Sequence, residues 1–583
     1  MPICFYDFEV FKKDWLVLIC NPFSEKAKWT LIHNNKEGLE KYHEEHKNEI
    51  WVGYNSRSYD TYILKGILLD FDPYEISNWI IKDKRKGWEY SSLFNKIQLF
   101  NYDCMPSKGH GLKTMEGFMG NDMQETSVPF DLDRKLTKDE LFETIKYCKH
   151  DVEQTMEVFI RNKADFDAHM NMLKTFDLPF RNISKTQAQL SALALGAVKH
   201  EWNDEWDYSI IDTLKINKYK HVIDWFNDQR YKRDYESMLT TEVCGVPHQF
   251  GWGGLHGAIG SVRIDKKGNR VIEGKPVHRK GLIIHVDVTS FYPSIMIRYD
   301  MLSRNVSDKA VYKQIYDTRV ALKKAGKKKE QAPYKIILNA TYGICKDKYN
   351  PMYDPRKANE VCVNGQLLLL DLLEHLEGHC ELIQSNTDGL IIQIPDTDEA
   401  FETIDDICYE WESRTGMGLG FDMITEIWQK DVNNYIFKFE NGKLERKGGY
   451  VKELTELDND LPIINKALVD AMTRKISVED TINQCDDLKQ FQKIVKVSSK
   501  YETAWHNEQR LSEKTFRVFA SKNESDTIIG KIKECSDKVE KFANTPEHCF
   551  IDNSDVNGKK VPNILDRQYY IDLAKKRLVQ FGM

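Results

Sequence analysis

Apolar and polar positions along the chain follow two different periods. Short runs rich in β-branched and aromatic residues, such as GLIIHVDV at 281–288, alternate with longer stretches whose apolar residues recur every three or four positions. The first pattern predicts strands and the second predicts amphipathic helices. Their alternation predicts a mixed α/β and α+β protein, and 583 residues exceed one ordinary core, so we expect several domains.

The clearest predicted helix covers 137–160. Thr137 and Glu140 form a capping-box pattern at its start. One apolar stripe follows, made of Leu141, Ile145, Cys148, Val152, Met156 and Phe159.

Three other segments have a predicted conformation. Tyr312–Lys324 and Pro333–Cys345 are expected to be helices, joined by the polar tip Ala325–Gln331 into a helical hairpin. The basic stretch Asp265–Gly281 is expected to form a β-hairpin with turns at its glycines. The region after Tyr450 is expected to be mainly helical, with polar loops.

Composition indicates a folded cytoplasmic protein. Hydrophobic residues make up 41% of the chain, and the 12 cysteines are scattered without a C-x-x-C pair. This pattern argues against a zinc ribbon or a secreted disulfide framework. Acidic residues within the first ten positions argue against a signal peptide, and no apolar run is long enough for a membrane span. We therefore expect no membrane partner.

Net charge is −7, from 83 basic and 90 acidic residues. An acidic balance is not the signature of a protein that coats nucleic acid. A protein that holds DNA in a locally basic channel is still compatible with it, so the motifs must decide.

A first set of carboxylates begins in the strand-like segment FYDFEVF. Asp7 and Glu9 are two residues apart and so point to the same face of the strand. Two adjacent carboxylates repel each other, and a divalent cation is a natural reason to keep them together. Alone, this pattern is more often a solvated strand face.

Two later segments complete this set. N-x-x-x-Y-D places Asn55 and Asp60 after the strand-like IWVGY, and Tyr147 and Asp151 share one face of the capped helix. Four carboxylates, Asp7, Glu9, Asp60 and Asp151, are what phosphodiester hydrolysis with two metal ions requires. Tyr147 is expected to orient the attacking water.

A second set of carboxylates lies in the middle of the chain. Asp287 ends an apolar strand and begins DVTSFYPSI, and Asp388 occupies a tight turn between two apolar strands. A carboxylate at the end of a buried strand is costly without a cation. Between them, KIILNATYG places Lys335, Asn339 and Tyr342 on one polar helix stripe.

These segments, in this order, resemble motifs A, B and C of the B-family (α-like) DNA polymerases. The motifs are D-x-x-S-F-Y-P-S-I from Asp287, K-x-x-x-N-x-x-Y-G from Lys335, and the T-D hairpin at Asp388. D-x-E, N-x-x-x-Y-D and Y-x-x-x-D before them resemble the three exonuclease motifs of proofreading polymerases. The resemblance implies an RNase H-like 3′→5′ exonuclease domain followed by a right-hand polymerase with palm, fingers and thumb.

The resemblance also implies a role for each motif residue. Asp287 and Asp388 would hold two Mg²⁺ ions, with Mn²⁺ as an alternative, and the exonuclease carboxylates would hold another pair. The expected nucleotide-binding residues are Tyr292 as the steric gate against a 2′-hydroxyl, Arg319, Lys323 and Lys335 on the triphosphate, and Asn339 and Tyr342 at the base pair. The expected DNA-binding residues are Asn55, Gly253, Gly254, Tyr435 and Lys447.

Two departures from the family pattern stand out. Asn386 replaces the first aspartate of the usual D-T-D-S hairpin, which leaves Asp388 as the essential ligand. Asn433 replaces the lysine of a K-x-Y element, and Lys443, Arg446 and Lys447 follow as candidates for the lost phosphate contact.

Spacing suggests a subclass. The intervals from Asp287 to Lys335 and from Asn339 to Asp388 are too short for the insertions of protein-primed polymerases. We therefore expect a compact bacteriophage-type enzyme that extends ordinary primer–template DNA with dNTPs. It is expected to be a monomer in the host cytoplasm and to work with a separate helicase or primase.

The expected domain boundaries follow the motifs. They are an exonuclease domain at 1–180, a connecting segment at 181–280, palm at 281–305 with motif A, fingers at 306–350, palm at 351–450 with motif C, and thumb at 451–583.

Three other functions stay open at this stage. The chain could be an exonuclease or scaffold that has lost synthesis, with Asn386 as the symptom, or an RNA-making primase, which Tyr292 opposes. A structural nucleoid protein would not need two separate carboxylate sets.

Overall fold

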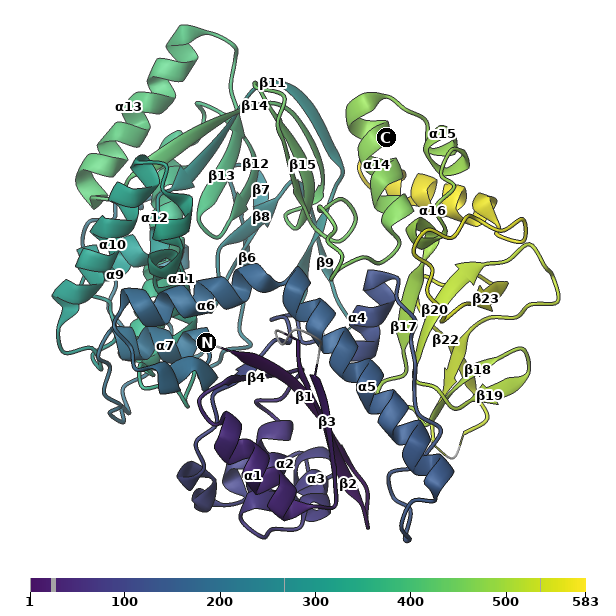
Figure 1. The fold of residues 1–583 in the computed structure, drawn as a ribbon. Helices are drawn as coiled ribbons and strands as arrows, with labels where there is room; N and C mark the ends of the chain where they lie inside the picture. The colour runs from purple at the N-terminus through teal and green to yellow at the C-terminus, as the bar shows by residue number, and fades with distance from the viewer. Residues whose placement is uncertain (1, 23–27, 267, 535) are drawn as a thin grey trace. The chain divides into compact units, whose positions relative to one another are not determined.

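The structure is a computed structural model that describes residues 2–22, 28–266, 268–534 and 536–583. The chain forms two compact units (Figure 1). Unit 1 consists of Met1–Thr186, Leu454–Ile464 and Glu479–Ile571; unit 2 consists of Gln187–Glu453, Asn465–Val478 and Asp572–Met583. Both combine helices with strands, as the sequence predicted. No helix within the described ranges has the length and apolar character of a membrane span.

A mixed sheet forms the N-terminal core of unit 1. Its strand order is β3-β2-β1-β4-β5, with β1, β2 and β3 antiparallel and β4 and β5 parallel to β1. The bounds are β1 Ile3–Val10, β2 Trp15–Asn21, β3 Lys28–His33, β4 Ile50–Gly53 and β5 Asn101–Asp103. One face of β1 packs with helices α1 (Lys36–His46), α2 (Asp60–Leu68) and α3 (Pro73–Ile81).

The opposite face of β1 carries Asp7 and Glu9 and is covered by α5 (Lys138–Arg161). The predicted capping box is confirmed, because Glu140 N–H donates to Thr137 Oγ1 at 3.3 Å and Thr137 N–H donates to Glu140 Oε2 at 2.8 Å. Figure 1 shows α5 as a long helix beside the strands. The neighbouring helices are α4 (Leu112–Met119) and α6 (Lys163–Thr175).

The late part of unit 1 is built mainly of strands, so the prediction of a mainly helical region after Tyr450 is wrong. Short strands pair there into two small antiparallel sheets, ordered β17-β20-β23 and β19-β18-β21-β22. Their bounds are β17 Lys493–Lys496, β18 Thr503–His506, β19 Gln509–Leu511, β20 Thr515–Ala520, β21 Gly530–Ile532, β22 Val539–Lys541 and β23 Cys549–Ile551. The helices are α14 (Pro462–Arg474), α15 (Val478–Asn483) and α16 (Arg567–Val579), and each of them begins in one unit and ends in the other.

The segment 479–571 also completes helix α4. The last carbonyl groups of a helix have no partner within the helix and must find one elsewhere. Here they accept hydrogen bonds from residues that come more than three hundred positions later: Arg517 to Gly117 and Asn121, Gln492 to Phe118, Lys489 to Met119, and the N–H of Val556 to Gly120.

Unit 2 is organised around an antiparallel sheet with the order β16-β15-β14-β11-β13-β12-β8-β7-β6 among the described residues. The bounds are β6 Leu239–Val243, β7 Val246–Phe250, β8 His256–Ala258, β11 Val277–Val288, β12 Glu381–Asn386, β13 Gly389–Gln393, β14 Leu419–Asp431, β15 Asn434–Phe439 and β16 Leu444–Lys447. The basic hairpin predicted for Asp265–Gly281 exists but is shifted toward the N-terminus: its strands are β9 (Gly260–Ile264) and β10 (Arg270–Gly274), and residues 277–281 belong to β11 instead, while residue 267 lies outside the described residues.

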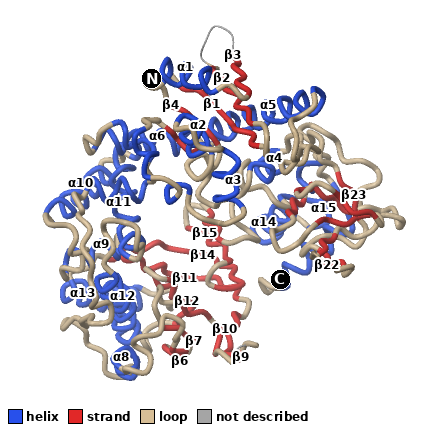
Figure 2. Tube along the Cα trace, turned by 90° about the horizontal axis from the view of Figure 1, so that it is seen from below, coloured by secondary structure: helices blue, strands red, loops and turns tan. Residues whose placement is uncertain are grey.

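Helices gather beside one side of this sheet (Figures 1 and 2). They are α7 (Gln187–Ala194), α8 (Lys220–Asn227), α9 (Phe291–Arg298), α10 (Lys309–Lys324), α11 (Lys328–Cys345), α12 (Pro355–Leu376) and α13 (Asp398–Thr415). The predicted helical hairpin is confirmed as α10 and α11, but α11 begins at Lys328, so the connecting tip is shorter than expected. Helix α12 lies at the centre and is buried over most of its length.

Candidate functional site

The first group of carboxylates gathers between β1, α2 and α5 in unit 1. Asp7 and Glu9 come from one face of β1, and Asp151 comes from α5. Asp60 is the first residue of α2, and its carboxylate accepts a hydrogen bond of 3.2 Å from the N–H of Phe8. Local sequence therefore places all four on rigid elements.

Burial of these carboxylates disfavours their charged forms. Glu9 is 6% exposed, Asp60 3% and Asp151 8%. Burial raises the pKa of Asp60 to about 7 and that of Asp151 to about 6. Burial, with added repulsion from neighbouring carboxylates, raises the pKa values of Asp7 and Glu9 well above their usual range.

This donor set fits divalent cations. Candidate ligand atoms of Asp7, Glu9 and Cys148 lie within 4.8 Å of one another. Buried carboxylates are stable only when paired or when they coordinate metal, and oxygen donors are those that Mg²⁺ prefers. The thiol of Cys148 is itself 3.5 Å from the carbonyl oxygen of Asp7, so we assign it to support of the strand.

Lys113 and Glu116 of α4 join this group, although sequence reasoning missed them. The Lys113 ammonium forms an ion pair with Asp151, lies 3.0 Å from Glu116 Oε1, and sits 4.6 Å from the centre of the Tyr147 ring. Burial and the Asp151 charge raise the pKa of Tyr147. The only sequence signal was a lysine at the start of an apolar helix, which is common on ordinary surfaces.

Asn55 lies apart from the buried group. It occupies the turn between β4 and α2 in a left-handed conformation with φ of 57°, and its side chain is exposed. The structure thus brings together Asp7, Glu9, Asp60, Tyr147 and Asp151, and leaves Asn55 at the surface.

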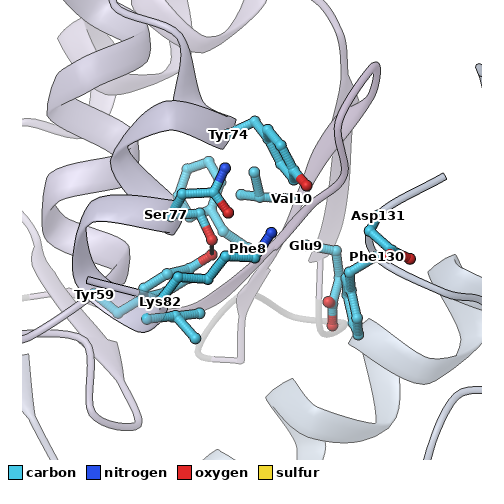
Figure 3. A pocket seen from close by; sticks show the side chains of 11 residues that line it. Phe8, Glu9, Val10, Tyr59, Tyr74, Ser77, Lys82, Phe130 and Asp131 are labelled. Carbon is cyan, nitrogen blue, oxygen red and sulfur yellow. Dashed lines mark hydrogen bonds between the residues drawn. The ribbon is translucent and has the colours of Figure 1, made fainter. Parts of the chain in front are cut away.

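A pocket of about 340 Å³ opens beside Glu9. Figure 3 shows Glu9 with Phe130 and Asp131 at one side, and Tyr59, Ser77 and Lys82 at the other. The wall is held in place by a hydrogen bond of 2.9 Å from the Tyr59 hydroxyl to Ser77 Oγ. Its aromatic and polar lining suits a planar ring that carries polar groups.

The second group of carboxylates lies at the end of the unit 2 sheet. Asp287 stands opposite Gly389 in the β11–β13 pairing, and Asp388 occupies the two-residue turn between β12 and β13. The predicted hairpin is confirmed, with Thr387 in the left-handed region at φ 57°. The N–H of Val288 donates to the carbonyl oxygen of Asp388 at 2.8 Å, which ties the turn to β11.

Burial and repulsion from Asp388 raise the pKa of Asp287 to about 6. Burial also raises the pKa of Asp388, against the opposing effect of His285 and Lys447. Asp422 of β14 adds further negative charge near Asp287 and was missed by sequence reasoning. Asp422 lies directly opposite His285 in the pairing of β11 with β14. Because these strands are far apart in sequence, only their register shows that Asp422 lies near Asp287.

The structure explains why position 386 carries an asparagine and not an aspartate. Its amide donates a hydrogen bond of 3.1 Å to the carbonyl oxygen of Val432, in the turn between β14 and β15. A carboxylate at this position has no proton to donate and would face that oxygen directly. The exchange of acid for amide therefore supports the hairpin that presents Asp388.

The predicted cations divide into two kinds. Arg319 donates to Ser290 Oγ at 2.8 Å, and burial lowers the pKa of its guanidinium. The positive charge of Lys323 favours the charged form of Asp287 and so opposes the larger effects that raise the pKa of this carboxylate. Lys335 and Asn339 lie exposed on α11.

The rings of Tyr292 and Tyr342 lie side by side next to α12. The ring centres of Tyr292 and Tyr342 are 4.5 Å apart. A Cβ at Gly365 of α12 would lie 3.2 Å from Tyr292 Cε1, so glycine leaves room for this ring. The motif A and motif B tyrosines therefore share one site.

The glycine segment 251–254 is held by α12. Gln366 donates to the carbonyl oxygens of Gly251 at 2.7 Å and Gly253 at 3.0 Å, and accepts from the N–H of Gly251 at 3.1 Å. A Cβ at Gly254 would lie 2.5 Å from Thr387 Oγ1. The segment therefore packs directly on the turn that carries Asp388.

Of the three basic candidates after Tyr435, the structure separates Arg446 from Lys447. Arg446 donates to the backbone carbonyls of Val451 and Lys452 and is committed to the fold. The Lys447 ammonium lies 5.7 Å from the centre of the Tyr435 ring, and its positive charge favours the charged form of Asp388. Lys443 instead lies over Phe439, at 5.8 Å.

Comparisons with known proteins give a limited likeness. No family model matches the chain. The chain is 24% identical over 197 residues to DNA polymerase 1 of Sulfurisphaera ohwakuensis. The alignment covers 33% of this chain and 21% of that protein, about a fifth of the relative's length.

A solved structure was also matched. It is the family B DNA polymerase from the hyperthermophilic archaeon Pyrobaculum calidifontis, with a TM-score of 0.41 and 13% identity, and the match covers 100% of this chain and 78% of that one. A TM-score below 0.5 is too low to carry an argument about fold or function. What bears on function is therefore the sequence likeness to an archaeal DNA polymerase over a third of the chain.

Proposed function

We propose that the chain is a DNA-directed DNA polymerase of the B family, which extends a primer 3′-end with dNTPs and proofreads with a 3′→5′ exonuclease. One observation carries this proposal. Each unit brings together carboxylates with raised pKa values. The exonuclease-like motifs supply the largely buried group of unit 1, and the polymerase-like motifs supply half-buried Asp287 and exposed Asp388 of unit 2. The likeness to DNA polymerase 1 of Sulfurisphaera ohwakuensis supports it.

Two divalent cations are proposed for each site, Mg²⁺ or alternatively Mn²⁺. In unit 2 the ligands are Asp287 and Asp388; in unit 1 they are Asp7, Glu9, Asp60 and Asp151. When bound, the cations supply activation of an attacking oxygen and neutralise charge on the leaving oxygen. The protein's part is to hold the carboxylates rigidly on strand ends and a two-residue turn.

The nucleotide site is proposed around the paired tyrosines. Arg319, Lys323 and Lys335 would meet the triphosphate as fixed cations, where negative charge develops during transfer. Because the Tyr292 ring is confined between Tyr342 and Gly365, it is rigid enough to exclude a 2′-hydroxyl. Asn339 and Tyr342 would line the base pair.

DNA contacts are proposed at two places in unit 2 and one in unit 1. A Cβ at Gly253 would meet no heavy atom of the described residues within 4 Å, so the backbone there is open to a template strand. Tyr435 and Lys447 would hold the primer end beside Asp388. Asn55 would contact the strand that enters the exonuclease.

In the exonuclease, Tyr147 would orient the attacking water and Lys113 would hold Asp151 and the Tyr147 ring in position. The pocket beside Glu9 would take the 3′-terminal nucleotide. Its volume of about 340 Å³ is in the range of small-molecule sites.

The remaining assignments are proposals of the same kind. They are exonuclease at 1–180, connection at 181–280, palm at 281–305 and 351–450, fingers at 306–350 and thumb at 451–583. A monomeric, bacteriophage-type enzyme of the host cytoplasm, with a separate helicase or primase, fits the short intervals between the motifs. The nine-stranded sheet that carries Asp287 and Asp388 supports the palm within the described residues.

Two variants separate the activities. Asp388→Ala should reduce primer extension with dNTPs at least about a hundredfold while hydrolysis of a mismatched 3′-end continues. Asp7→Ala should do the opposite. Asp405→Asn, which changes an exposed carboxylate on α13, is the control that should retain both activities.

The outcome also decides between the rivals. Absence of dNTP incorporation by the unaltered protein would leave an exonuclease or scaffold, and preferential use of NTPs would indicate a primase. If Asp7→Ala leaves hydrolysis intact, the exonuclease assignment is wrong.

A further inference from the structure

A short basic loop follows helix α3 in unit 1. Its sequence KDKRK places Lys82, Lys84, Arg85 and Lys86 within five residues, with Asp83 as the one acid. All five side chains are exposed. The motifs of the proposed function do not use this loop.

The backbone fixes the loop in a tight turn. The N–H groups of Lys82 and Asp83 both donate to the carbonyl oxygen of Asn78, and these two hydrogen bonds close the last turn of α3. Lys84 then adopts a left-handed conformation with φ of 54°, and the N–H of Arg85 returns to the carbonyl oxygen of Trp79. The cations are therefore displayed on an ordered turn.

These cations differ from other lysines of the same unit. Lys36, Lys47 and Lys163 each form an ion pair with a nearby carboxylate. Among the residues that the structure describes, no carboxylate oxygen lies within 4 Å of a side-chain nitrogen of the four loop cations. The helix C-terminus accounts for one favourable cation within its last turn, but not for four.

The loop is continuous with the pocket beside Glu9. Lys82 lines that pocket, and its side chain runs along the wall in Figure 3. The remaining cations follow within four residues of it. Lys82 thus joins the pocket wall to the turn that carries the other three cations.

Aromatic surface accompanies the charge. Trp88, in the 3₁₀ turn Gly87–Glu89, is 56% exposed although it is a large apolar side chain. The Arg85 guanidinium lies 4.2 Å from the centre of the Trp79 ring. Cations interleaved with exposed rings are typical of surfaces that hold single-stranded nucleic acid, since phosphates meet the charges and unpaired bases stack on the rings.

We propose that Lys82, Lys84, Arg85, Lys86 and Trp88 form a landing surface for single-stranded DNA, which guides an unpaired 3′-end into the pocket beside Glu9. The inference rests on the proposed exonuclease function and assigns a strand path to it. Because stacking on Trp88 requires an unpaired base, the surface also favours frayed ends over paired ones.

The test compares two substrates in the full chain. One is single-stranded oligo(dT), which is long enough to reach the loop; the other is the p-nitrophenyl ester of thymidine 5′-phosphate, which fills only the pocket. The variant is Lys84→Ala/Arg85→Ala/Lys86→Ala. The control is Lys41→Ala/Lys163→Ala/Lys174→Ala, which removes three exposed lysines from other helices of unit 1.

We expect the loop variant to raise KM for oligo(dT) about tenfold, with little change in kcat. The slope of log KM against log salt should fall by about 2, since each phosphate contact on a single strand contributes about 0.7. Trp88→Ala should raise KM at least about fivefold without changing the salt slope, and Trp88→Tyr should restore it. The control variant should match the unaltered protein.

The two possible failures are distinguishable. If the unaltered protein hydrolyses neither substrate, the proposed exonuclease is wrong. If it hydrolyses both, and the loop variant keeps the KM and the salt slope of the control, the landing surface is wrong. An equal loss on both substrates would likewise overturn it, because the loop would then act only on the pocket.

Discussion

At the scale of single residues, polar side chains on α12 form hydrogen bonds with the backbone of neighbouring loop segments and hold those segments in place. Gln366 makes three hydrogen bonds to the backbone of Gly251 and Gly253, and that segment packs on Thr387 beside Asp388. Asn364, two residues earlier, holds the backbone of Ser209 and Ile211 in the same way. Through these hydrogen bonds, α12 fixes the position of two segments that have no regular secondary structure.

Gln366→Leu should selectively impair primer extension. The buried N–H of Gly251 loses its acceptor, and the carbonyl oxygens of Gly251 and Gly253 lose an amide donor but keep the Cys362 thiol, so the change costs about 1 to 3 kcal/mol. With the glycine segment released, the turn at Asp388 loses its packing, so we expect at least about a tenfold loss of extension, measured as kcat/KM for dNTP. Hydrolysis at the 3′-end, which we propose for unit 1, should be retained.

Asn364→Leu is the matched control, because it removes a buried amide from the same helix without touching the glycine segment. It should destabilise unit 2 to a similar extent and retain extension at low temperature. Equal loss of extension in both variants would show that Gln366 contributes only stability.

The carboxylates of unit 1 predict a pH dependence of stability. In metal-free protein the folded-state pKa of Asp60 is about 7 and that of Asp151 about 6, whereas unfolded aspartates titrate near 4. The folded state therefore binds more protons in between, and its stability should fall as the pH rises from about 4 to 7. Mg²⁺ binds the deprotonated carboxylates and should reverse this loss.

We accordingly expect Mg²⁺ to raise the melting temperature of unit 1 by more at about pH 8 than at about pH 5.5. Differential scanning calorimetry with Mg²⁺ and with chelator measures the difference. Asp60→Asn should stabilise the metal-free protein at the higher pH and weaken the Mg²⁺ response. An equal Mg²⁺ shift at both pH values would contradict this account.

At the scale of elements, the success of sequence reasoning followed how local the determining contacts are. The capping box of α5, the turn at Asp388 and the α10–α11 hairpin depend on residues close in sequence, and their patterns predicted them. Several strands after 493 pair with partners farther along the chain, such as β20 with β23, so the local sequence did not reveal them and the region was predicted to be helical.

The candidate sites show the same limit. Motif residues on β1, α2, α5, β11 and the β12–β13 turn were proposed from short motifs and their resemblance to B-family polymerases, and the structure brings them into two groups. Lys113, Asp422 and Gln366 were not, because each acts on residues from another element, and a lysine, aspartate or glutamine in isolation has many ordinary roles. Long-range pairing carries that part of the information.

Arg517 of β20 gives an element-scale prediction. Its guanidinium is fully buried and donates to the carbonyl oxygens of Gly117, Asn121, Asp552 and Ser554. Arg517→Met should lower the free energy of unfolding of unit 1 by about 3 kcal/mol, since several buried acceptors lose their donor. Hydrogen exchange should show faster exchange in α4, and 3′-end hydrolysis should decline because α4 carries Lys113.

Arg510→Met removes an exposed guanidinium from β19 of the same unit and serves as the matched control. Unchanged exchange in α4 upon Arg517→Met would show that this helix does not depend on the distant arginine.

At the scale of the whole molecule, unit 1 is assembled from segments at both ends of the chain. Replacing 479–571 by a flexible linker should therefore unfold α4 and its surroundings, because their hydrogen-bond donors are removed. Limited proteolysis should then cleave within 104–186 while Gln187–Glu453 resists. Continued protection of α4 in this deletion would contradict the proposed dependence.

The remote capping of α4 has a consequence for the order of protein synthesis. The ribosome makes residues up to Thr186 early, but the donors that complete α4 appear only when the chain has been made as far as Val556. At about 5–20 residues per second, that interval lasts roughly 20 to 80 s. The nascent chain therefore passes through most of its synthesis before the arrangement around Lys113 and Asp151 is complete, and a partly made chain would lack the proposed capacity to degrade DNA.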